Sequence, residues 1–149
     1  MISIQSEELM NITVEDLMIP SEKVAHVQGG NPIEHALLVL VKSGYSAVPV
    51  LDPTYKLKGV ISKTIIIDNM LGIERFELEK LSEIRVEEVM NEDIPCLNKT
   101  DSFSKGLDAV VDHPFVCVSD EDGYFDGILT RRAILKHLKR HLYTYNYKK

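Results

Sequence analysis

The sequence has no tryptophan, only two cysteines and no long apolar run. A membrane-spanning helix needs roughly 18 or more consecutive apolar residues, so no such helix is expected. Residues 1–8 carry neither a basic start nor the apolar stretch of a secretion signal. These absences predict a cytoplasmic location.

The two cysteines, Cys96 and Cys117, stand in no paired metal-ligand motif. Cys117 lies in an apolar run, where a free thiol behaves as a small hydrophobic side chain. A structural disulfide is rare in a reducing compartment. We therefore predict two unreactive thiols and no metal site.

Acidic residues outnumber basic ones, and the net charge is −6. This balance argues against a general nucleic-acid binder, which would be basic over the whole domain. From Arg131 to Lys149, however, every charged residue is basic. The pattern favours a solvated C-terminal helix and tail, with contact to RNA or an acidic protein as the less favoured alternative.

The chain contains a diverged internal duplication. The motif TVEDLM at 13–18 recurs as RVEEVM at 85–90, and GVIS at 59–62 recurs as GILT at 127–130. Leu37 and Leu107 match between these motifs, at an intermediate spacing. Agreement in order, type and spacing indicates two copies of one structural unit.

Each copy is predicted to run strand, helix, strand, strand, helix, in an α/β (α+β) fold. In the first copy, Asn31 is expected to cap a helix that Gly44 ends, and a second helix follows Ser62. Asp101 takes the capping role in the second copy. The strands between the helices are predicted over 47–51, up to 61, over 115–119 and over 127–129.

The predicted organisation follows the order of the chain. Residues 1–72 form an N-terminal segment and the first repeat, 73–84 a linker, and 85–149 the second repeat with the basic helix and tail. The stretch from about Leu71 to Ile84, rich in Glu and Leu, is predicted to be helical. Neither repeat alone would bury much core, so the two should pack about a pseudo-two-fold axis with paired clefts between them.

The duplicated motifs, with GYSAVPVLD at 44–52 and its weaker partner HPFVCVSD at 113–120, resemble the CBS-domain pair, or Bateman module. The resemblance covers residues 13–142 and extends to the stand-alone cyclic di-AMP-binding CBS proteins of the CbpB or DarB type. It implies a homodimeric regulatory protein without catalytic activity. It also implies a client enzyme, with the alarmone synthetase/hydrolase as one candidate.

The resemblance further implies which residues bind a nucleotide in the first cleft. They come from the segment after the opening motif, the segment before the apolar strand, and the start of the last helix. The set is Lys23, Val24, Ala25, Val27, Tyr45, Ser46, Ala47, Pro49, Thr130, Arg131 and Arg132. His26 falls within the first of these segments and has no sequence partner for acid–base work.

The chemistry of these residues suits an adenine nucleotide. Thr130 would cap a helix whose free amides attract anions. Arg131 and Arg132 would contact phosphate, helped by Lys23. Tyr45 would stack on adenine, which is worth about 1–3 kcal/mol in single-stranded nucleic acids. The alternative is that these are ordinary surface residues, although two cations in a first helical turn oppose the helix dipole.

The second cleft differs in its chemistry. Asp93 stands where the first cleft has Lys23, and His113 stands where it has Tyr45. Thr64 replaces Arg132. Phosphate would meet a carboxylate and lose an arginine, so we predict one nucleotide per chain.

The resemblance also bears on which nucleotide binds. Adenosine-binding CBS repeats usually carry an aspartate three residues after the closing Ser or Thr, where it binds both ribose hydroxyls; here these positions are Ile65 and Ala133. A 3′,5′-cyclic dinucleotide has its 3′-oxygens esterified and cannot make that contact. The regulatory ligand is thus predicted to be cyclic di-AMP, with AMP, ADP or ATP as alternatives and no cofactor.

Two other classes of protein, a metal-dependent enzyme and a protein-interaction module, are alternatives to a nucleotide sensor. His137 and His141 have the spacing of a helical metal pair, but no third ligand is evident in the sequence. No catalytic constellation is evident either. A protein-interaction module with empty clefts remains the main alternative to a sensor.

Overall fold

A computed structural model describes residues 4–147, with the side chains of 7–143. The chain forms two compact units, each with its own hydrophobic core. Unit 1 comprises residues up to Val24, then Pro95–Asp122 and Asp126 onward. Unit 2 comprises Ala25–Ile94 and Gly123–Phe125.

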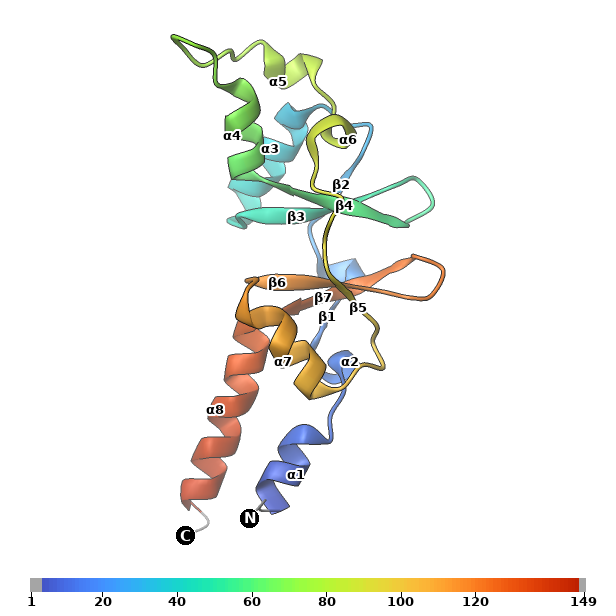
Figure 1. Ribbon diagram of the computed structural model, residues 1–149, viewed down its shortest axis with the longest axis vertical. Coiled ribbons are helices and arrows are strands. Elements are labelled where there is room, and N and C mark those ends of the chain that lie inside the picture. Colours follow the sequence, from blue (N-terminus) through green and yellow to red (C-terminus); the bar gives the residue numbers. More distant parts are fainter. Residues whose placement is uncertain (1–3, 148–149) are drawn as a thin grey trace. The chain divides into compact units, whose positions relative to one another are not determined.

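Unit 2 is a three-stranded sheet with helices on one face (Figure 1). The strand order is β2-β3-β4, with β2 parallel and β4 antiparallel to β3. Its elements are β2 (Val27–Gln28), α3 (Ile33–Ser43), β3 (Ala47–Leu51), β4 (Leu57–Ser62), α4 (Lys63–Met70), α5 (Lys80–Glu83) and α6 (Val86–Val89). Buried aliphatic side chains from the sheet, α3 and α4 form the core, with Ile33, Leu40, Val50, Ile61 and Ile66 fully enclosed.

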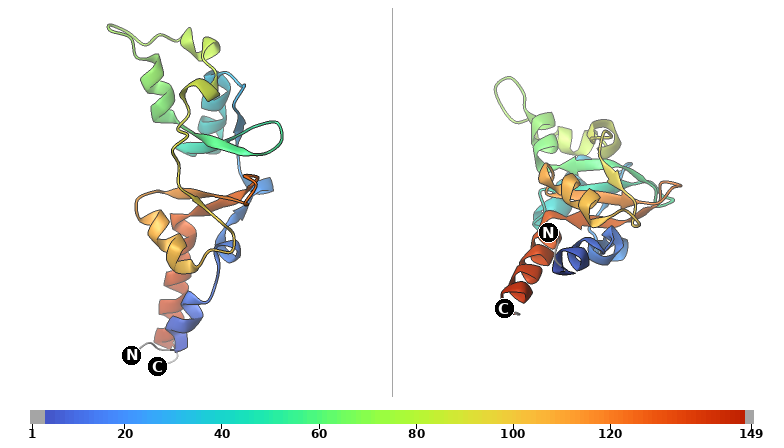
Figure 2. Two further views of the ribbon diagram at one scale, coloured as in Figure 1. Left: turned by 45° about the vertical axis from the view of Figure 1, so that its right-hand side comes forward. Right: turned by 60° about the horizontal axis from the view of Figure 1, so that its bottom comes forward.

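Unit 1 repeats this plan around a four-stranded sheet of order β1-β7-β6-β5. Its elements are α1 (Ile4–Met10), α2 (Val14–Leu17), β1 (Ile19–Pro20), η1 (Ser21–Lys23), β5 (Cys96–Leu97), α7 (Phe103–Val111), β6 (Phe115–Ser119), β7 (Phe125–Thr130) and α8 (Arg131–Tyr147). Phe103, Val118, Leu129 and Ile134 are among its buried core residues. Helix α1 packs along α8, as both views in Figure 2 show.

The predicted strand-helix-strand-strand-helix order of both repeats is confirmed. It appears as β2-α3-β3-β4-α4 and as β5-α7-β6-β7-α8. Gly44 ends α3 in the left-handed conformation, with φ of 78°, which a glycine adopts without strain. The basic C-terminal segment is helical, as expected; Lys148 and Lys149 lie outside the described residues.

The two predicted N-caps, Asn31 and Asp101, are wrong by one residue. The helices begin after Pro32 and Ser102, and the Ser102 hydroxyl accepts the amide of Lys105 at 3.2 Å. Asn31 Oδ1 instead accepts the backbone amide of Gln28, and Asp101 Oδ2 that of Asn98, at 2.9 and 2.8 Å. Each side chain therefore closes the turn before its helix, because short polar side chains bond local amides in several geometries.

The predicted helix over about 71–84 is also wrong. Only Lys80–Glu83 forms a helical turn, α5. Residues 71–79 form a tight hairpin instead, closed by a bond from the Glu77 amide to the Met70 carbonyl at 2.6 Å. Glu and Leu favour helix on average, but local backbone bonds decided the conformation of this segment.

The opening motifs exchange between the repeats. Val14, from the first opening motif, is buried in the core built by the second repeat, and Val86 is buried in the core of the first. The amides of Val14 and Val86 donate to the carbonyls of Asp101 and Asn31, at 2.9 and 2.8 Å. Each unit therefore includes the opening segment of the other repeat. The domain boundaries predicted from the sequence follow the order of the chain and do not include this exchange.

A carboxylate at the third helical position stabilises the start of both exchanged segments. Asp16 Oδ2 accepts the amide of Thr13 at 2.9 Å, and Glu88 Oε2 accepts that of Arg85 at 2.6 Å. These bonds satisfy amides that a helix start leaves free. The acidic residues shared by VEDLM and VEEVM thus have a structural role.

Candidate nucleotide-binding site

The residues predicted to bind a nucleotide are divided between the two units. Unit 2 holds Ala25, Val27, Tyr45, Ser46, Ala47 and Pro49. Unit 1 holds Lys23, Val24, Thr130, Arg131 and Arg132.

In unit 2 the set lies on β2 and at the start of β3. Val27 pairs with Val50 in the parallel ladder and is buried, and Ala25 packs against the same core. Ala47 and Pro49 pair with Ser62 and Val60 of β4. These residues are fixed by the sheet, so the backbone around them is a rigid surface for a ligand.

Tyr45 and Ser46 connect α3 to β3. The Tyr45 side chain is 45% exposed and has no ring contact among the described residues. Its amide donates to the Ser43 hydroxyl at 3.3 Å, and the Ser46 carbonyl accepts the amide of Lys63 at 3.0 Å. The backbone is thus held while the tyrosine ring is left available for stacking.

In unit 1, Lys23 and Val24 close the short helix η1. The Val24 amide donates to the Ser21 carbonyl at 3.1 Å, and the Val24 side chain is buried. Lys23 is exposed and forms no ion pair with any side chain that the structure describes. A cation without a protein partner is available to an anionic ligand.

Thr130 caps α8, as predicted. Its hydroxyl accepts the amide of Ala133 at 3.0 Å. Ser62 has the same position before α4, where it accepts the amide of Ile65 at 3.1 Å. The amide of Arg131 donates to the Pro114 carbonyl at 2.8 Å, so two of the amides at the start of α8 are already bonded. A phosphate at this helix start would rely more on side chains than the sequence suggests.

The two arginines at the start of α8 differ. Arg131 donates from Nε to the Val110 carbonyl at 2.8 Å and from Nη2 to the Val111 carbonyl at 3.3 Å. It therefore binds the last turn of α7, where cations are favoured. Arg132 is exposed, with no side-chain hydrogen bond or ion pair in the described part of the chain. Arg131 thus has a structural reason to be there, and Arg132 does not.

The two cysteines lie on neighbouring strands of unit 1. Cys96 and Cys117 form no disulfide within the described part of the chain, and they face each other in the register of β5 and β6. Burial raises the pKa of both thiols, that of Cys117 to about 12, so little thiolate forms at neutral pH. This agrees with the prediction of two unreactive thiols.

His137 and His141 stack edge to face, with ring centroids 4.8 Å apart, and His137 also contacts Phe103. Burial lowers the pKa of His137, and the nearby His141 lowers it further. Within residues 4–147, no group of three or more His, Cys, Asp or Glu side chains is placed to hold a metal ion. Nor does the described chain contain a helix long and apolar enough to cross a membrane.

The repeated fold and the residues at its strand ends define the class of protein. The CBS domain model matches residues 14–72 and again 86–140, so the chain belongs to the CBS-domain family as a tandem pair. This confirms the resemblance read from the duplicated motifs. The predicted fold class is confirmed with it.

The chain is also similar to individual proteins. The chain is 51% identical over 146 residues to Cyclic di-AMP receptor B of Bacillus subtilis (strain 168), covering 98% of this chain and 99% of that protein. A crystal structure of Listeria monocytogenes CbpB in complex with c-di-AMP is 50% identical, with a TM-score of 0.83 over 88% of this chain and 98% of that chain.

A CBS domain-containing protein of unknown function from Bacillus anthracis str. Ames Ancestor is 64% identical. Its TM-score is 0.85, over 90% of this chain and 97% of that chain. The similarity to these relatives spans nearly the whole length on both sides. The similarity therefore includes both CBS repeats.

Proposed function

We propose that the chain is a non-catalytic regulatory protein that binds cyclic di-AMP and controls a partner according to ligand occupancy. The observation that carries the proposal is the exposed Arg132 at the start of α8, whose side chain has no partner among the residues that the structure describes. It occurs in a chain about half identical to a protein named as a cyclic di-AMP receptor and to one crystallised with that nucleotide.

Each unit contributes nucleotide-binding residues of its own in this proposal. Arg132 binds phosphate bidentately, and Lys23 adds a second cation. The exposed Tyr45 ring stacks on adenine, and the backbone around Ala25 and Ala47 contacts the adenine edge. Arg131 contributes less than Arg132, because its guanidinium binds the end of α7 and its amide donates to the Pro114 carbonyl.

Cyclic di-AMP is favoured over AMP, ADP and ATP by what stands at the third position of each closing helix. Ile65 packs against the core of unit 2, and Ala133 has no polar side chain. Neither can bind the two free ribose hydroxyls of a mononucleotide. A cyclic dinucleotide has its 3′-oxygens esterified and cannot make the two-hydroxyl contact, so the lack of an aspartate at these positions does not weaken its binding.

A homodimer is part of the proposal. Large apolar side chains are exposed on the helices of both units: Leu38 and Val41 on α3, Ile67 on α4, Val111 on α7, and Leu135 and Leu142 on α8. Apolar surface of this extent favours association with another protein surface. The client enzyme, with the alarmone synthetase/hydrolase as first candidate, and the cytoplasmic location complete the proposal.

A thermal-shift panel followed by calorimetry tests the proposal. The panel holds cyclic di-AMP, AMP, ADP, ATP, S-adenosylmethionine and cyclic di-GMP. A ligand at one hundred times its Kd stabilises the native state by about 2.7 kcal/mol, which shifts the melting temperature by several degrees. We expect that shift with cyclic di-AMP. No shift with any nucleotide would favour a ligand-free interaction module instead.

A further inference from the structure

The hairpin between α4 and α5, residues 71–79, is ordered by its own backbone. Leu71 and Phe76 form an antiparallel bridge, and the Gly72 amide donates to the Arg75 carbonyl at 2.8 Å. The Glu77 amide donates to the Met70 carbonyl, which ties the hairpin to the last residue of α4. We call this segment the linker hairpin; it extends beyond the end of α4 in Figures 1 and 2.

The linker hairpin presents large apolar side chains to solvent. The exposed fractions are 103% for Ile73, 63% for Leu78, and 52% for both Leu71 and Phe76. Single exposed apolar residues are ordinary on protein surfaces, but several gathered in one short segment mark an interaction site.

Anchoring of the linker does not explain this exposure. Leu81 and Ile84, further along the same linker, pack against the core of unit 2 and hold it there. In the second repeat, the helix equivalent to α4 is α8, which continues without a hairpin to Tyr147. The linker hairpin therefore has no counterpart after α8, the equivalent helix of the second repeat, within the described residues.

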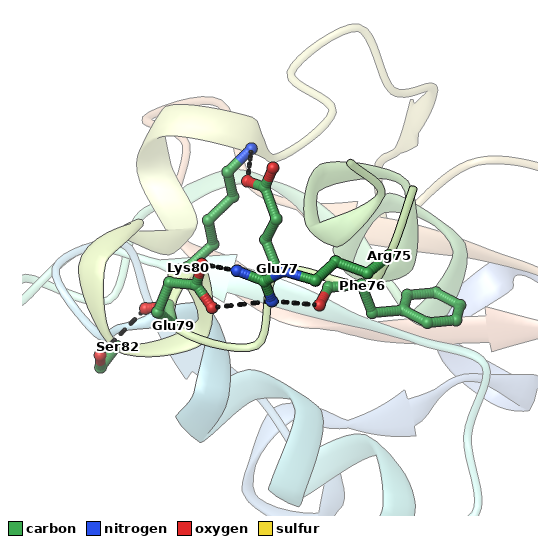
Figure 3. Close-up of polar contacts among 6 residues, drawn as sticks. All are labelled: Arg75, Phe76, Glu77, Glu79, Lys80 and Ser82. Carbon is green, nitrogen blue, oxygen red and sulfur yellow. Dashed lines mark hydrogen bonds and ion pairs between the residues drawn. The ribbon is translucent and has the colours of Figure 1, made fainter. Parts of the chain in front are cut away.

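Ion pairs fix the shape of the linker hairpin. Arg75 Nη2 lies 2.8 Å from Glu79 Oε1, and Arg75 Nη1 donates to the Phe76 carbonyl at 2.9 Å (Figure 3). Lys80 Nζ lies 2.8 Å from Glu77 Oε2. A segment already held in one conformation loses little entropy when it binds.

The charge around the apolar tip is negative. The two cations, Arg75 and Lys80, are used by Glu79 and Glu77. Glu74 and Glu83 are exposed, and neither side chain has a hydrogen-bonding or ion-pair partner within the described residues. A complementary surface would therefore be an apolar pocket with basic residues at its rim.

A continuous set of backbone bonds connects the linker hairpin to residues assigned to the nucleotide. The Ser46 carbonyl accepts the amide of Lys63, the first residue of α4, at 3.0 Å. At the other end of α4, the Met70 carbonyl accepts the amide of Glu77 at 2.6 Å. A ligand that moves the segment around Tyr45 and Ser46 can therefore bias the position of the hairpin through one rigid helix.

We propose that the linker hairpin is the element that docks on the client protein, with Ile73 and Phe76 entering an apolar pocket whose rim is rich in Lys and Arg. Its coupling to nucleotide occupancy through α4 rests on the function proposed above. The docking itself follows from the exposed side chains, the ion pairs and the negative rim.

Photocrosslinking in cells identifies the client. The full-length chain carries p-benzoylphenylalanine in place of Ile73, and the attached protein is identified by mass spectrometry and purified. The alarmone synthetase/hydrolase is tested beside it as a purified probe. Calorimetry then gives the Kd for the wild-type chain and for Ile73→Ser, Phe76→Ser, Glu74→Lys and Met10→Ser.

We expect Ile73→Ser and Phe76→Ser each to weaken client binding at least tenfold. Glu74→Lys should weaken it less and reduce its salt dependence, because one attractive charge becomes repulsive. Met10→Ser, which removes a half-exposed apolar side chain from α1 in the other unit, should change nothing. All four variants should bind cyclic di-AMP with wild-type affinity.

Wild-type client affinity in the Ile73→Ser and Phe76→Ser variants would overturn the proposal, and so would the absence of any crosslinked protein. A crosslink only to a second copy of this chain would overturn it too and would assign the hairpin to self-association. If hairpin variants lose the client while no nucleotide binds the wild-type chain, the docking role stands and the proposed sensing function fails.

Discussion

Arg131 and Val110 are joined by a hydrogen bond of 2.8 Å from the guanidinium Nε to the carbonyl oxygen, at the last turn of α7. The neighbouring Arg132 makes no such bond with any described residue. Two adjacent arginines that look equivalent in the sequence therefore have different surroundings. One is a structural cap and the other is available to a ligand.

This difference predicts that substitution of the two arginines has separate effects. Arg132→Met should abolish detectable cyclic di-AMP binding and leave the melting temperature of the ligand-free chain unchanged. Arg131→Met should lower the free energy of unfolding by about 1 kcal/mol, because it removes a charged donor from helix carbonyls that are only partly shielded from water. Calorimetry and denaturant unfolding measure the two quantities.

Arg132→Lys serves as the control, since it keeps the charge but loses the bidentate geometry. It should retain weakened binding. Unchanged affinity in Arg132→Met would remove Arg132 from the site, and equal losses of stability in both Met variants would contradict the structural distinction.

Two glycines of the closing motifs lie so close to neighbouring backbone that we expect their substitution by alanine to destabilise the chain. A Cβ atom on Gly127 would collide with the carbonyl oxygen of Ile19, and one on Gly59 would lie 2.7 Å from the carbonyl oxygen of Asn91. Both neighbours are backbone of the exchanged opening segments and cannot rotate away. Gly127→Ala and Gly59→Ala should each destabilise the chain by roughly 1–3 kcal/mol in urea unfolding.

Gly30→Ala is the matched control. A Cβ there meets no heavy atom within 4 Å, and Gly30 has no positive φ. Its stability should be within about 0.5 kcal/mol of wild type, as for surface substitutions in general. A Gly127→Ala variant as stable as Gly30→Ala would show that the exchanged segment does not pack closely against β7.

The sequence predicts the repeated part of the fold well because apolar periodicity and the paired motifs both report on it. The strands over 47–51 and 115–119 match β3 and β6 residue for residue. The cap of α8 at Thr130 is also correct, since a hydroxyl directly before a helical run has few alternatives.

What the sequence does not predict depends on partners distant in the chain. Val14 and Val86 pack in the core of the opposite repeat, and no local pattern reports such an exchange. The hydrogen bond from Arg131 to the Val110 carbonyl cannot be predicted from the sequence either, because it joins residues that only the fold brings together. The hairpin over 71–79 was missed for another reason: its Glu and Leu residues favour helix on average, but their backbone forms local hairpin bonds instead.

Asp126 gives a pH-dependent prediction. Its Oδ2 atom is buried without a hydrogen-bonding partner among the described residues. Burial raises the pKa of this carboxyl; the charge of Lys99 lowers it, and the charges of Asp120 and Glu15 raise it further. A carboxyl whose pKa is raised by folding stabilises the protein while it is protonated, and that contribution is lost as the pH rises through the folded-state pKa.

Asp126→Asn should therefore raise the melting temperature near neutral pH, where the wild-type carboxylate is charged. The gain should disappear below about pH 3.9, the ordinary pKa of Asp, where both forms are neutral. Melting curves of both proteins over that range check this. Asp122→Asn, at an exposed aspartate of the preceding turn, should show no such dependence. A gain that is constant with pH would point to packing rather than charge.

Tyr45 gives the last prediction, which concerns the ligand directly. If its exposed ring stacks on adenine, Tyr45→Ala should lose about 1–3 kcal/mol of binding free energy, or about 5- to 150-fold in Kd, while Tyr45→Phe keeps the ring and the affinity. Tyr143→Ala, at a similarly exposed tyrosine on α8, is the control and should bind as wild type.

The same titrations give the stoichiometry, which should be one nucleotide per chain because Asp93 and His113 replace Lys23 and Tyr45 in the second repeat. Two equivalent sites per chain would refute this asymmetry, and full affinity in Tyr45→Ala would remove stacking from the account of how the nucleotide is held.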